Sequence, residues 1–206
     1  RTSVLQNDGK LIVGGEFLNY NGSTTPYLCR LHTDGTKDVG FNLGSGFNGK
    51  IHTAVIQSDG KIIVGGSFTT FNGIPAGRLV RLNVDGSIDS AFDTSVAASS
   101  GTVYGLALQT DGKLLVIGSF TKYNGASANR IVRLNPNGDI DISFVTGTAG
   151  SSTIEDVAIA SDGKIVLSGT FSSFNGNLNY PKLVRLQSNG SIDTSFSIGA
   201  GFDDAI

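Results

Sequence analysis

Short apolar runs alternate with turn residues along the whole chain, and their order repeats. In the best-preserved copy the alternating stretch 51–57 leads into the turn 58–60, and the apolar run 62–64 follows. A third apolar run, 79–82, ends in Arg-Leu before another glycine turn. Short runs rich in Val, Ile and Phe between Gly, Asn and Asp are typical of strands. No stretch keeps a helical apolar period for long enough to indicate a helix. The pattern therefore predicts an all-β protein.

The same pattern occurs four times. The tripeptide Asp-Gly-Lys marks each copy, and its successive positions are 51, 52 and 51 residues apart. A period of this length indicates a repeat architecture. Each unit is interpreted as a four-stranded antiparallel meander, with approximate boundaries at 1–45, 46–97, 98–149 and 150–200.

One such sheet cannot bury both of its apolar faces by itself. Copies stacked face to face around an axis solve this problem, and that arrangement is the β-propeller. The rival architecture, a linear β-solenoid, usually has shorter repeats and parallel coils. We therefore expect residues 1–206 to form a single β-propeller domain of four-stranded antiparallel blades.

The turns set the register of the strands. A three-residue loop at 58–60 places Ile56 opposite Ile62, and a similar loop places Arg81 opposite Asp89. An Arg and an Asp eight residues apart recur in every copy, so we expect one cross-strand ion pair per unit: Arg30 with Asp38, Arg81 with Asp89, Arg133 with Asp141, and Arg185 with Asp193. The lysine after each Asp-Gly is expected to be a solvated turn residue.

The two ends of the chain match one interior stretch. Residues 201–206 resemble 46–51, and residues 1–6 resemble 52–57. Joined end to start, they would complete the first strand of the N-terminal blade. Two interpretations follow: a closed four-bladed ring, which we favour, or a segment of a larger propeller, including a ring completed by other chains.

Several motifs recur in order in all four copies and carry a resemblance to a known family. The second copy shows them best, with Val64-Gly65-Gly66-Ser67-Phe68, then Asn72-Gly73, then Arg81-Leu82-Asn83-Val84-Asp85-Gly86-Ser87. This pattern resembles the delta-60 repeat, and the resemblance covers the whole chain. Kelch-like propellers rank second, because kelch repeats carry a tryptophan and this chain has none. The delta-60 resemblance implies a β-propeller module of bacterial or phage surface proteins and no activity.

Composition narrows the functional classes. The formal net charge is −2, so no basic field for nucleic acid is expected. The chain has no apolar run long enough for a membrane helix, so no membrane insertion is expected. Cys29 is the single cysteine, which rules out a disulfide framework. The Asp-Gly turns do not match a calcium loop, which places glycine at its sixth position, and we expect no metal and no cofactor.

Catalytic groups are scarce. The two histidines, His32 and His52, lie at non-equivalent places in the repeat, and neither is expected to have a nearby partner. Acid–base chemistry needs a cluster of positioned groups, and the acidic residues that are unique to single copies, such as Glu155, fall at scattered positions. We do not expect an enzyme.

The aromatic-Asn-Gly groups are the candidates for ligand binding, because the loops after them vary most between copies and variable loops on a repeated scaffold often bind ligands. Tyrosines there could stack on a sugar while amides supply hydrogen bonds. The alternative, which we favour for the repeated aromatics, is that they pack blade against blade. The candidate ligand-binding residues are Tyr20, Asn21, Tyr27, Asn72, Tyr123, Asn124, Asn175 and Tyr180.

The sequence thus predicts a non-enzymatic structural or adhesive module of an exported bacterial or phage protein. Its expected place is extracellular, on the cell surface or on a virion. Its expected partners are a protein or a surface glycan, with self-association as a further expectation. The alternative function is a lectin-like propeller with one carbohydrate site per blade.

Overall fold

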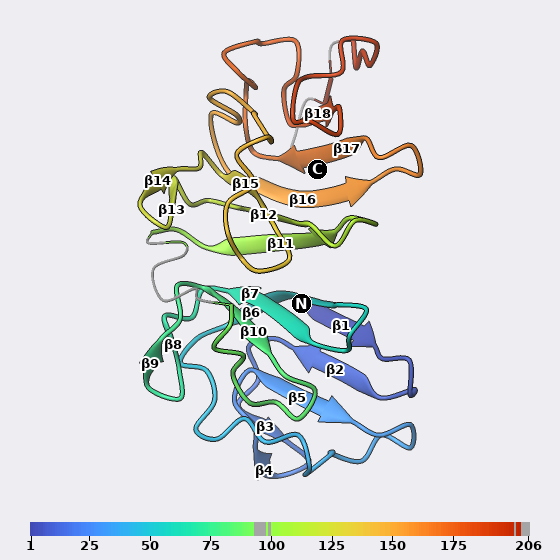
Figure 1. Cartoon of the computed structure of the whole chain (residues 1–206), viewed down its shortest axis with the longest axis vertical. Coiled ribbons are helices and arrows are strands. Elements are labelled where there is room, and N and C mark those ends of the chain that lie inside the picture. The colour runs from blue at the N-terminus through green and yellow to red at the C-terminus, as the bar shows by residue number, and fades with distance from the viewer. Residues whose placement is uncertain (93–97, 99, 200, 203–206) are drawn as a thin grey trace.

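The computed structural model describes residues 1–92, 98, 100–199 and 201–202, and its regular structure there is all-β (Figure 1). Each repeat contributes one three-stranded antiparallel sheet. The sheets are β1 (Thr2–Leu5), β2 (Leu11–Gly14) and β5 (Leu28–Leu31); β6 (Ile51–Ile56), β7 (Ile62–Gly66) and β10 (Leu79–Leu82); β11 (Val103–Leu108), β12 (Leu114–Gly118) and β15 (Ile131–Leu134); and β16 (Ile154–Ile159), β17 (Ile165–Gly169) and β18 (Leu183–Leu186).

A short hairpin separates the second and third strands of the first three sheets. Its turn is Asn-Gly with both residues in the left-handed region, as in Asn72 (φ 52°) and Gly73 (φ 75°). Asn and Gly tolerate this backbone conformation best, and two such residues in succession make the tight turn of a two-residue hairpin. The hairpins are β3 (Asn19–Tyr20) with β4 (Ser23–Thr24), β8 (Thr70–Phe71) with β9 (Ile74–Pro75), and β13 (Lys122–Tyr123) with β14 (Ala126–Ser127).

The predicted register is confirmed, and the fourth strand of each meander is very short. Ile56 pairs with Ile62, and Leu82 pairs with Ile88 as an isolated bridge. Directly after this bridge the chain bends away at Asp89, whose carbonyl accepts a hydrogen bond from the amide of Phe92 at 3.1 Å. The outer edge of each sheet is therefore a single bridge that ends in a turn.

Both faces of the interior sheets are covered by neighbouring sheets. On β7, Ile62 and Val64 belong to the apolar cluster shared with the first repeat, whereas Ile63 belongs to the cluster shared with the third. The same alternation places Leu115 of β12 in the cluster shared with the fourth repeat. Because successive residues of a strand face opposite sides, one apolar run supplies two cores. The innermost strands β1, β6, β11 and β16 contact one another in sequence order.

The four sheets do not close into a ring within the part of the chain that the structure describes. Strand pairing there joins only strands of the same repeat. In Figure 1 the outer strands β5 and β18 of the first and last sheets lie at opposite ends of the molecule. The favoured expectation of a closed four-bladed ring is therefore wrong, because no described segment bridges the last sheet back to the first, and the open series agrees with a segment of a larger propeller. Residues 203–206, which were expected to help complete the N-terminal blade, lie outside the described residues.

Candidate functional site

An ion-pair cluster that recurs in each repeat occupies its outer part. In the second repeat the Arg81 Nε donates to Asp89 Oδ2 at 2.7 Å, and Lys61 Nζ lies 2.9 Å from the same oxygen. The Arg81 guanidinium also lies over the ring of Phe92, 4.5 Å from its centre, a favourable cation–π distance. The predicted cross-strand ion pairs are confirmed in all four copies. The expectation of solvated lysines is wrong, because each lysine reaches back to the buried aspartate of its own repeat.

Hydrogen bonds hold the cluster carboxylates in their charged form. Burial of Asp38 opposes ionisation, but hydrogen bonds from Lys10, from the Gly40 amide and from Arg30 together lower its pKa to about 2. Asp89 also has a lowered pKa for the corresponding reasons. These carboxylates are thus poor proton donors at neutral pH, and the cluster serves the architecture of the repeat.

A bulge on the innermost strand of each later repeat points one side chain away from the sheet. The register of β6 against β7 shifts between Ile51 and Thr53, which leaves His52 unpaired. The same shift isolates Tyr104 on β11 and Glu155 on β16. A bulged residue escapes the strict alternation of a strand, so bulges often redirect functional side chains.

The three bulge residues and Arg1, which holds the same place before β1, line one hollow of about 390 Å³. We call it the inner hollow. The rings of His52 and Tyr104 meet edge to face, with their centres 5.1 Å apart. Partial burial, together with the nearby charges of Arg1 and Lys50, lowers the pKa of His52, so its imidazole is neutral at neutral pH. The hollow therefore presents a guanidinium, a neutral imidazole, a phenol and a carboxylate.

Sequence reasoning missed the inner hollow. The expectation that His52 has no nearby partner is wrong, because the fold brings Tyr104 of the next repeat against it. Glu155 also does not stand alone, since it lines the same hollow as His52. The available signal was that these positions share one phase of the repeat and carry a different kind of side chain in every copy.

The predicted ligand-binding asparagines lie in the hairpin turns. Asn21, Asn72, Asn124 and Asn175 all have positive φ, between 46° and 52°. The Asn72 Oδ1 accepts a hydrogen bond from the Gly46 amide at 3.0 Å, and the Asn175 Oδ1 accepts one from the Ala149 amide at 2.8 Å. These two side chains therefore fasten the segment that enters the repeat from the preceding one.

The predicted aromatic residues lie mostly within the packing between repeats. Tyr123 is fully buried, and Tyr180 is 8% exposed. Tyr20 is half-buried, and its hydroxyl donates to the Gly35 carbonyl at 2.6 Å. Tyr27 is also half-buried and packs against the core shared by the first two repeats. Ligand binding by this set of residues stays a prediction.

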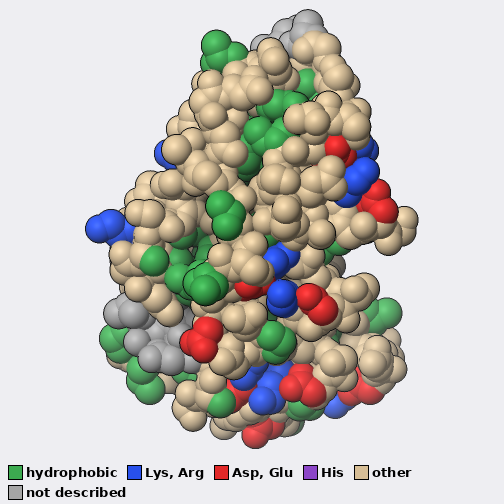
Figure 2. Space-filling model, turned by 45° about the horizontal axis from the view of Figure 1, so that its top comes forward, with side chains coloured by type: hydrophobic (Ala, Val, Ile, Leu, Met, Phe, Trp, Pro, Cys, Tyr) green, Lys and Arg blue, Asp and Glu red, His purple; other side chains and the backbone are tan. Residues whose placement is uncertain are grey.

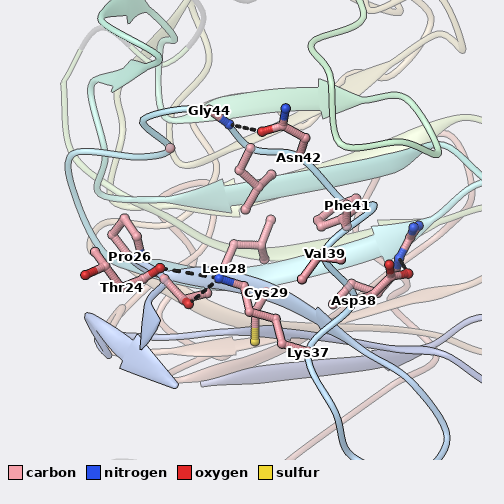
Figure 3. Close-up of a pocket in the computed structure, with 14 residues that line it drawn as sticks. Thr24, Pro26, Leu28, Cys29, Lys37, Asp38, Val39, Phe41, Asn42 and Gly44 are labelled. Atoms are coloured by element: carbon pink, nitrogen blue, oxygen red, sulfur yellow. Dashed lines mark hydrogen bonds and ion pairs between the residues drawn. The ribbon is translucent and has the colours of Figure 1, made fainter. Parts of the chain in front are cut away.

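A second hollow, the outer pocket, lies beside the loop that contains Pro26 (Figure 3). Its volume is about 200 Å³, and a pocket of about 230 Å³ occupies the equivalent place in the third repeat. In the first repeat Lys37 takes the place of Ile140, and its Nζ donates to Thr25 Oγ1 at 2.8 Å. Cys29 lines the same pocket, and burial raises the pKa of its thiol. The outer pocket of the first repeat is thus more polar than its counterpart.

Charged groups on the face shown in Figure 2 form small mixed groups in which Lys and Arg lie beside Asp and Glu. Within the described residues, no group of three or more His, Cys, Asp or Glu side chains is placed to hold a metal ion. Nor does this part of the chain contain a helix with the length and apolar character needed to cross a bilayer.

A known family model matches the four repeats of the chain. The model described as a domain of unknown function (DUF5122) beta-propeller matches residues 6–41, 57–92, 109–144 and 160–196. The chain belongs to this family. Each matched segment runs from the first turn of a repeat to the phenylalanine of its ion-pair cluster. The family pattern therefore contains the turns, strands and ion-pair residues described above. No curated protein matches the chain.

Solved structures show the same fold at low sequence identity. The extracellular domain of a putative one-component system from B. thetaiotaomicron is 16% identical, with a TM-score of 0.59, and the match covers 99% of this chain and 22% of that one. A gluconolactonase from Xanthomonas campestris is 13% identical, with a TM-score of 0.51 and coverage of 81% and 52%. The surface component PorZ of the type-IX secretion system of Porphyromonas gingivalis is 10% identical, with a TM-score of 0.50 and coverage of 98% and 28%.

At these identities the likeness is one of fold. The DUF5122 propeller described here spans about a fifth of the length of the extracellular sensor domain and about half the length of the gluconolactonase that it resembles.

Proposed function

We propose that this DUF5122 propeller is a non-enzymatic interaction module of an exported bacterial or phage protein, and that it binds a protein or another surface ligand at the inner hollow. The supporting observation is the contrast between repeated and unrepeated residues. The Arg, Asp and Lys residues common to the copies form the ion-pair clusters, and the common Asn-Gly pairs form turns with positive φ. Arg1, His52, Tyr104 and Glu155 share one position of the repeat, differ in chemistry and face one hollow.

The chemistry of the inner hollow suits recognition of a polar ligand with both kinds of charge. The edge-to-face pair of His52 and Tyr104 offers an amphipathic surface, of the kind enriched where proteins bind partners. Arg1, which is ion-paired with Glu16, and Glu155 place opposite charges on the first and last repeats. An exposed peptide segment or a charged surface polymer has this combination of groups.

An extracellular or surface location is part of the proposal. It is supported by the fold likeness to an extracellular sensor domain and to a bacterial surface component, and by the delta-60 resemblance of the motifs. A direct check is to locate the tagged protein by fractionating the producing cells and their medium.

Binding is tested with labelled protein on bacterial cell-wall polysaccharide, on intact cells and on a peptide array. The double variant His52→Ala/Tyr104→Ala removes the paired rings and is expected to reduce binding at least about tenfold, which corresponds to 1.4 kcal/mol. His32→Ala is the matched control, because this histidine lies outside the hollow, beside Asp38. Equal binding by the double variant and the control would exclude the inner hollow as the site.

The second candidate function is a lectin-like site at each hairpin loop. It is favoured by the outer pocket, which lies beside the Tyr27 loop in the first repeat and recurs in the third. A glycan array distinguishes the two. Loss of glycan binding on Tyr27→Ala or Tyr180→Ala with the fold intact would support the lectin, and loss on His52→Ala/Tyr104→Ala alone would support the inner hollow.

The absence of enzymatic activity is also testable. Because the fold likeness includes a gluconolactonase, the relevant assay is hydrolysis of an aldonolactone. The release of acid measures this hydrolysis. We expect no turnover above the uncatalysed rate. Turnover that is lost on Glu155→Gln would overturn the proposal of a non-enzymatic module.

A further inference from the structure

The contacts between successive repeats form a recurring junction with two halves. In the outer half, the turn of one repeat docks on the ion-pair cluster of the repeat before it. The Arg30 Nη1 donates to the Val84 carbonyl at 2.6 Å, and the Asn42 amide donates to the Asp85 carbonyl at 2.9 Å. The ring of Phe41 lies against Gly86, where a Cβ atom would come within 3.2 Å of the ring.

The outer half repeats with the same partners further along the chain. Arg81 Nη1 donates to the Pro136 carbonyl at 2.6 Å, and Arg133 Nη1 donates to the Ser188 carbonyl. The rings of Phe92 and Phe144 lie against the next glycines, Gly138 and Gly190.

In the inner half of the junction, the connector that leaves one repeat packs on the next. Phe47, at the end of the first connector, forms a bridge with Phe71 and lies edge to face on Phe68, with ring centres 4.6 Å apart. Ala98 and Gly150 occupy the same place after the second and third repeats and bridge to Tyr123 and Phe174. Phe68 and Phe71 are fully buried as a result.

The fourth repeat presents the receiving cluster of the outer half with no partner among the described residues. The Arg185 Nε still donates to Asp193 Oδ2 at 2.8 Å, and the guanidinium still lies 4.5 Å above the Phe196 ring. The Arg185 side chain is 26% exposed, however, compared with 7% for Arg30. Among its described contacts, no hydrogen bond to a following turn is found.

The first repeat presents the matching turn, on which no ion-pair cluster of another repeat docks among the described residues. The one side-chain hydrogen bond found there from outside the turn to a turn carbonyl is donated by the Tyr20 hydroxyl of the same repeat to Gly35. Thr33, Asp34 and Gly35 correspond to Val84, Asp85 and Gly86. A Cβ atom at Gly35 would meet nothing within 4 Å, whereas Gly86 is in contact with Phe41. The turn is already formed, because the Asp34 Oδ1 accepts hydrogen bonds from the amide and the hydroxyl of Thr36 at 2.9 and 2.7 Å.

The two surfaces of the inner half also lack a partner repeat among the described residues: the connector after the fourth repeat, and the aromatic residues of the first repeat. After the fourth repeat, Gly201 N donates to the Ile198 carbonyl at 3.0 Å, just as Gly46 N donates to the Leu43 carbonyl at 2.9 Å. Lys182 holds the Phe202 carbonyl as Arg130 holds that of Gly150. Phe202 is thus presented where Phe47 stands, but it is 46% exposed. At the other end, Phe17 and Tyr20 are only half-buried, although they correspond to the fully buried Phe68 and Phe71.

We propose that the fourth repeat of one chain binds the first repeat of a second copy through this same junction. The turn 33–36 of the second copy docks on Arg185 and Phe196, and Phe202 packs on Phe17 and Tyr20 of the second copy. The occupant follows from the three interior junctions, where the same two surfaces are already seen together. Both halves also require the same orientation, with the last repeat of one copy against the first repeat of the other.

Such a contact is heterologous, so it yields a ring if the rotation closes and a longer chain of copies if it does not. In a closed pair, each copy would use its first repeat and its fourth repeat once. The proposal deepens the expectation of self-association by naming the two surfaces, and it does not depend on the inner hollow or its ligand.

The test is the mass of the purified chain in solution, measured by sedimentation velocity over rising concentration. We expect species heavier than one chain as the concentration rises to about 1 mM. At that concentration a dissociation constant of about 1 mM already gives a measurable fraction of associated chains. Phe202→Ala and Gly35→Asn are each expected to weaken association at least about tenfold. Asparagine tolerates positive φ, so Gly35→Asn adds a side chain in the docking path while keeping the turn.

Two matched controls separate docking from folding. Leu178→Ala removes another exposed apolar side chain from the fourth repeat, and Gly22→Asn adds the same side chain to an open hairpin turn of the first repeat. Neither should change association. A mass of one chain at every concentration, or association that Phe202→Ala and Gly35→Asn leave unchanged, would overturn the proposal. A circular dichroism melt of each variant confirms that the fold is intact.

Discussion

The second and fourth repeats contain the same ion-pair cluster in two surroundings. Arg81 and Arg185 lie equally close to their aspartates, at 2.7 and 2.8 Å, and equally far above their phenylalanine rings, at 4.5 Å. The guanidinium of Arg81 is covered by the next repeat, whereas that of Arg185 is about a quarter exposed. The cluster is therefore assembled within each repeat, and the neighbour adds only burial and one hydrogen bond to a carbonyl.

The same comparison holds for the connector. Phe68 is sealed by Phe47, whereas the corresponding Phe17 remains half-buried. Each repeat thus carries preformed surfaces. Their contribution to the free energy of unfolding depends on whether a neighbouring repeat covers them. Substitutions at equivalent positions can measure that contribution directly.

The largest difference is expected at the sealed phenylalanine. Phe68→Ala removes a fully buried ring and should lower the free energy of unfolding by about 3–5 kcal/mol. Phe17→Ala should cost clearly less, because solvent already reaches the ring. Urea denaturation followed by circular dichroism measures both. A loss below about 1 kcal/mol for Phe68→Ala would contradict its place in the core.

A smaller but still large difference is expected for the carboxylates. Asp89→Ala leaves the buried Arg81 without its counter-ion and should cost about 3 kcal/mol, at the low end for a broken buried pair, because Arg81 keeps its bond to the Pro136 carbonyl. Asp193→Ala should cost less, since water can reach Arg185. Equal losses in the two denaturation curves would show that the neighbouring repeat does not shield the cluster.

The glycines of the docking turns give the next contrast. Gly86→Asn forces a side chain against Phe41 and the backbone of Asn42, and overpacking of this kind costs about 1–3 kcal/mol. Gly35→Asn adds the same side chain in open space, so its loss should consist of the cost of positive φ alone and should be smaller than that of Gly86→Asn, which has the same backbone cost and the overpacking as well. Thermal melts at low protein concentration test the pair, and a large loss for Gly35→Asn would mean that its turn is not free.

The last comparison concerns the pH dependence that one carboxylate of the cluster gives to stability. Asp38 has a pKa of about 2 in the folded protein, below the value of about 3.9 in an unfolded chain. A lowered folded pKa contributes stability above the unfolded value, and this contribution is lost as the pH falls through the folded one. Unfolding midpoints should therefore decline between about pH 4 and pH 2. Asp38→Asn should flatten this decline, and an unchanged slope would contradict the assignment.

Local chemistry made most of the fold predictable. The loop at 58–60 predicted the pairing of Ile56 with Ile62, and the spacing of Arg81 and Asp89 predicted their ion pair. Such features depend on residues a few positions apart, where strand geometry leaves little freedom. The inner hollow was not predictable in this way, because His52 and Tyr104 are brought together only by the stacking of two repeats.

The buried positions of candidate residues also depended on neighbours. Tyr123 and Tyr20 hold the same place in the repeat, yet one is fully buried and the other half-buried. The pattern within one repeat is the same in both cases. The difference arises from the preceding connector, which covers Tyr123 and which no described residue supplies for Tyr20.

The sequence by itself determined the repeat, the strands, their register and the ion pairs, because each of these follows from turn chemistry and the two-residue alternation of strands. Only the tertiary structure decided that the sheets of the described residues form an open series, that four dissimilar side chains line one hollow and that the outer faces of the first and fourth repeats meet no other described residue. These features depend on the angle and contact between whole sheets, which are set by packing across repeats and leave no mark in the pattern of a single one.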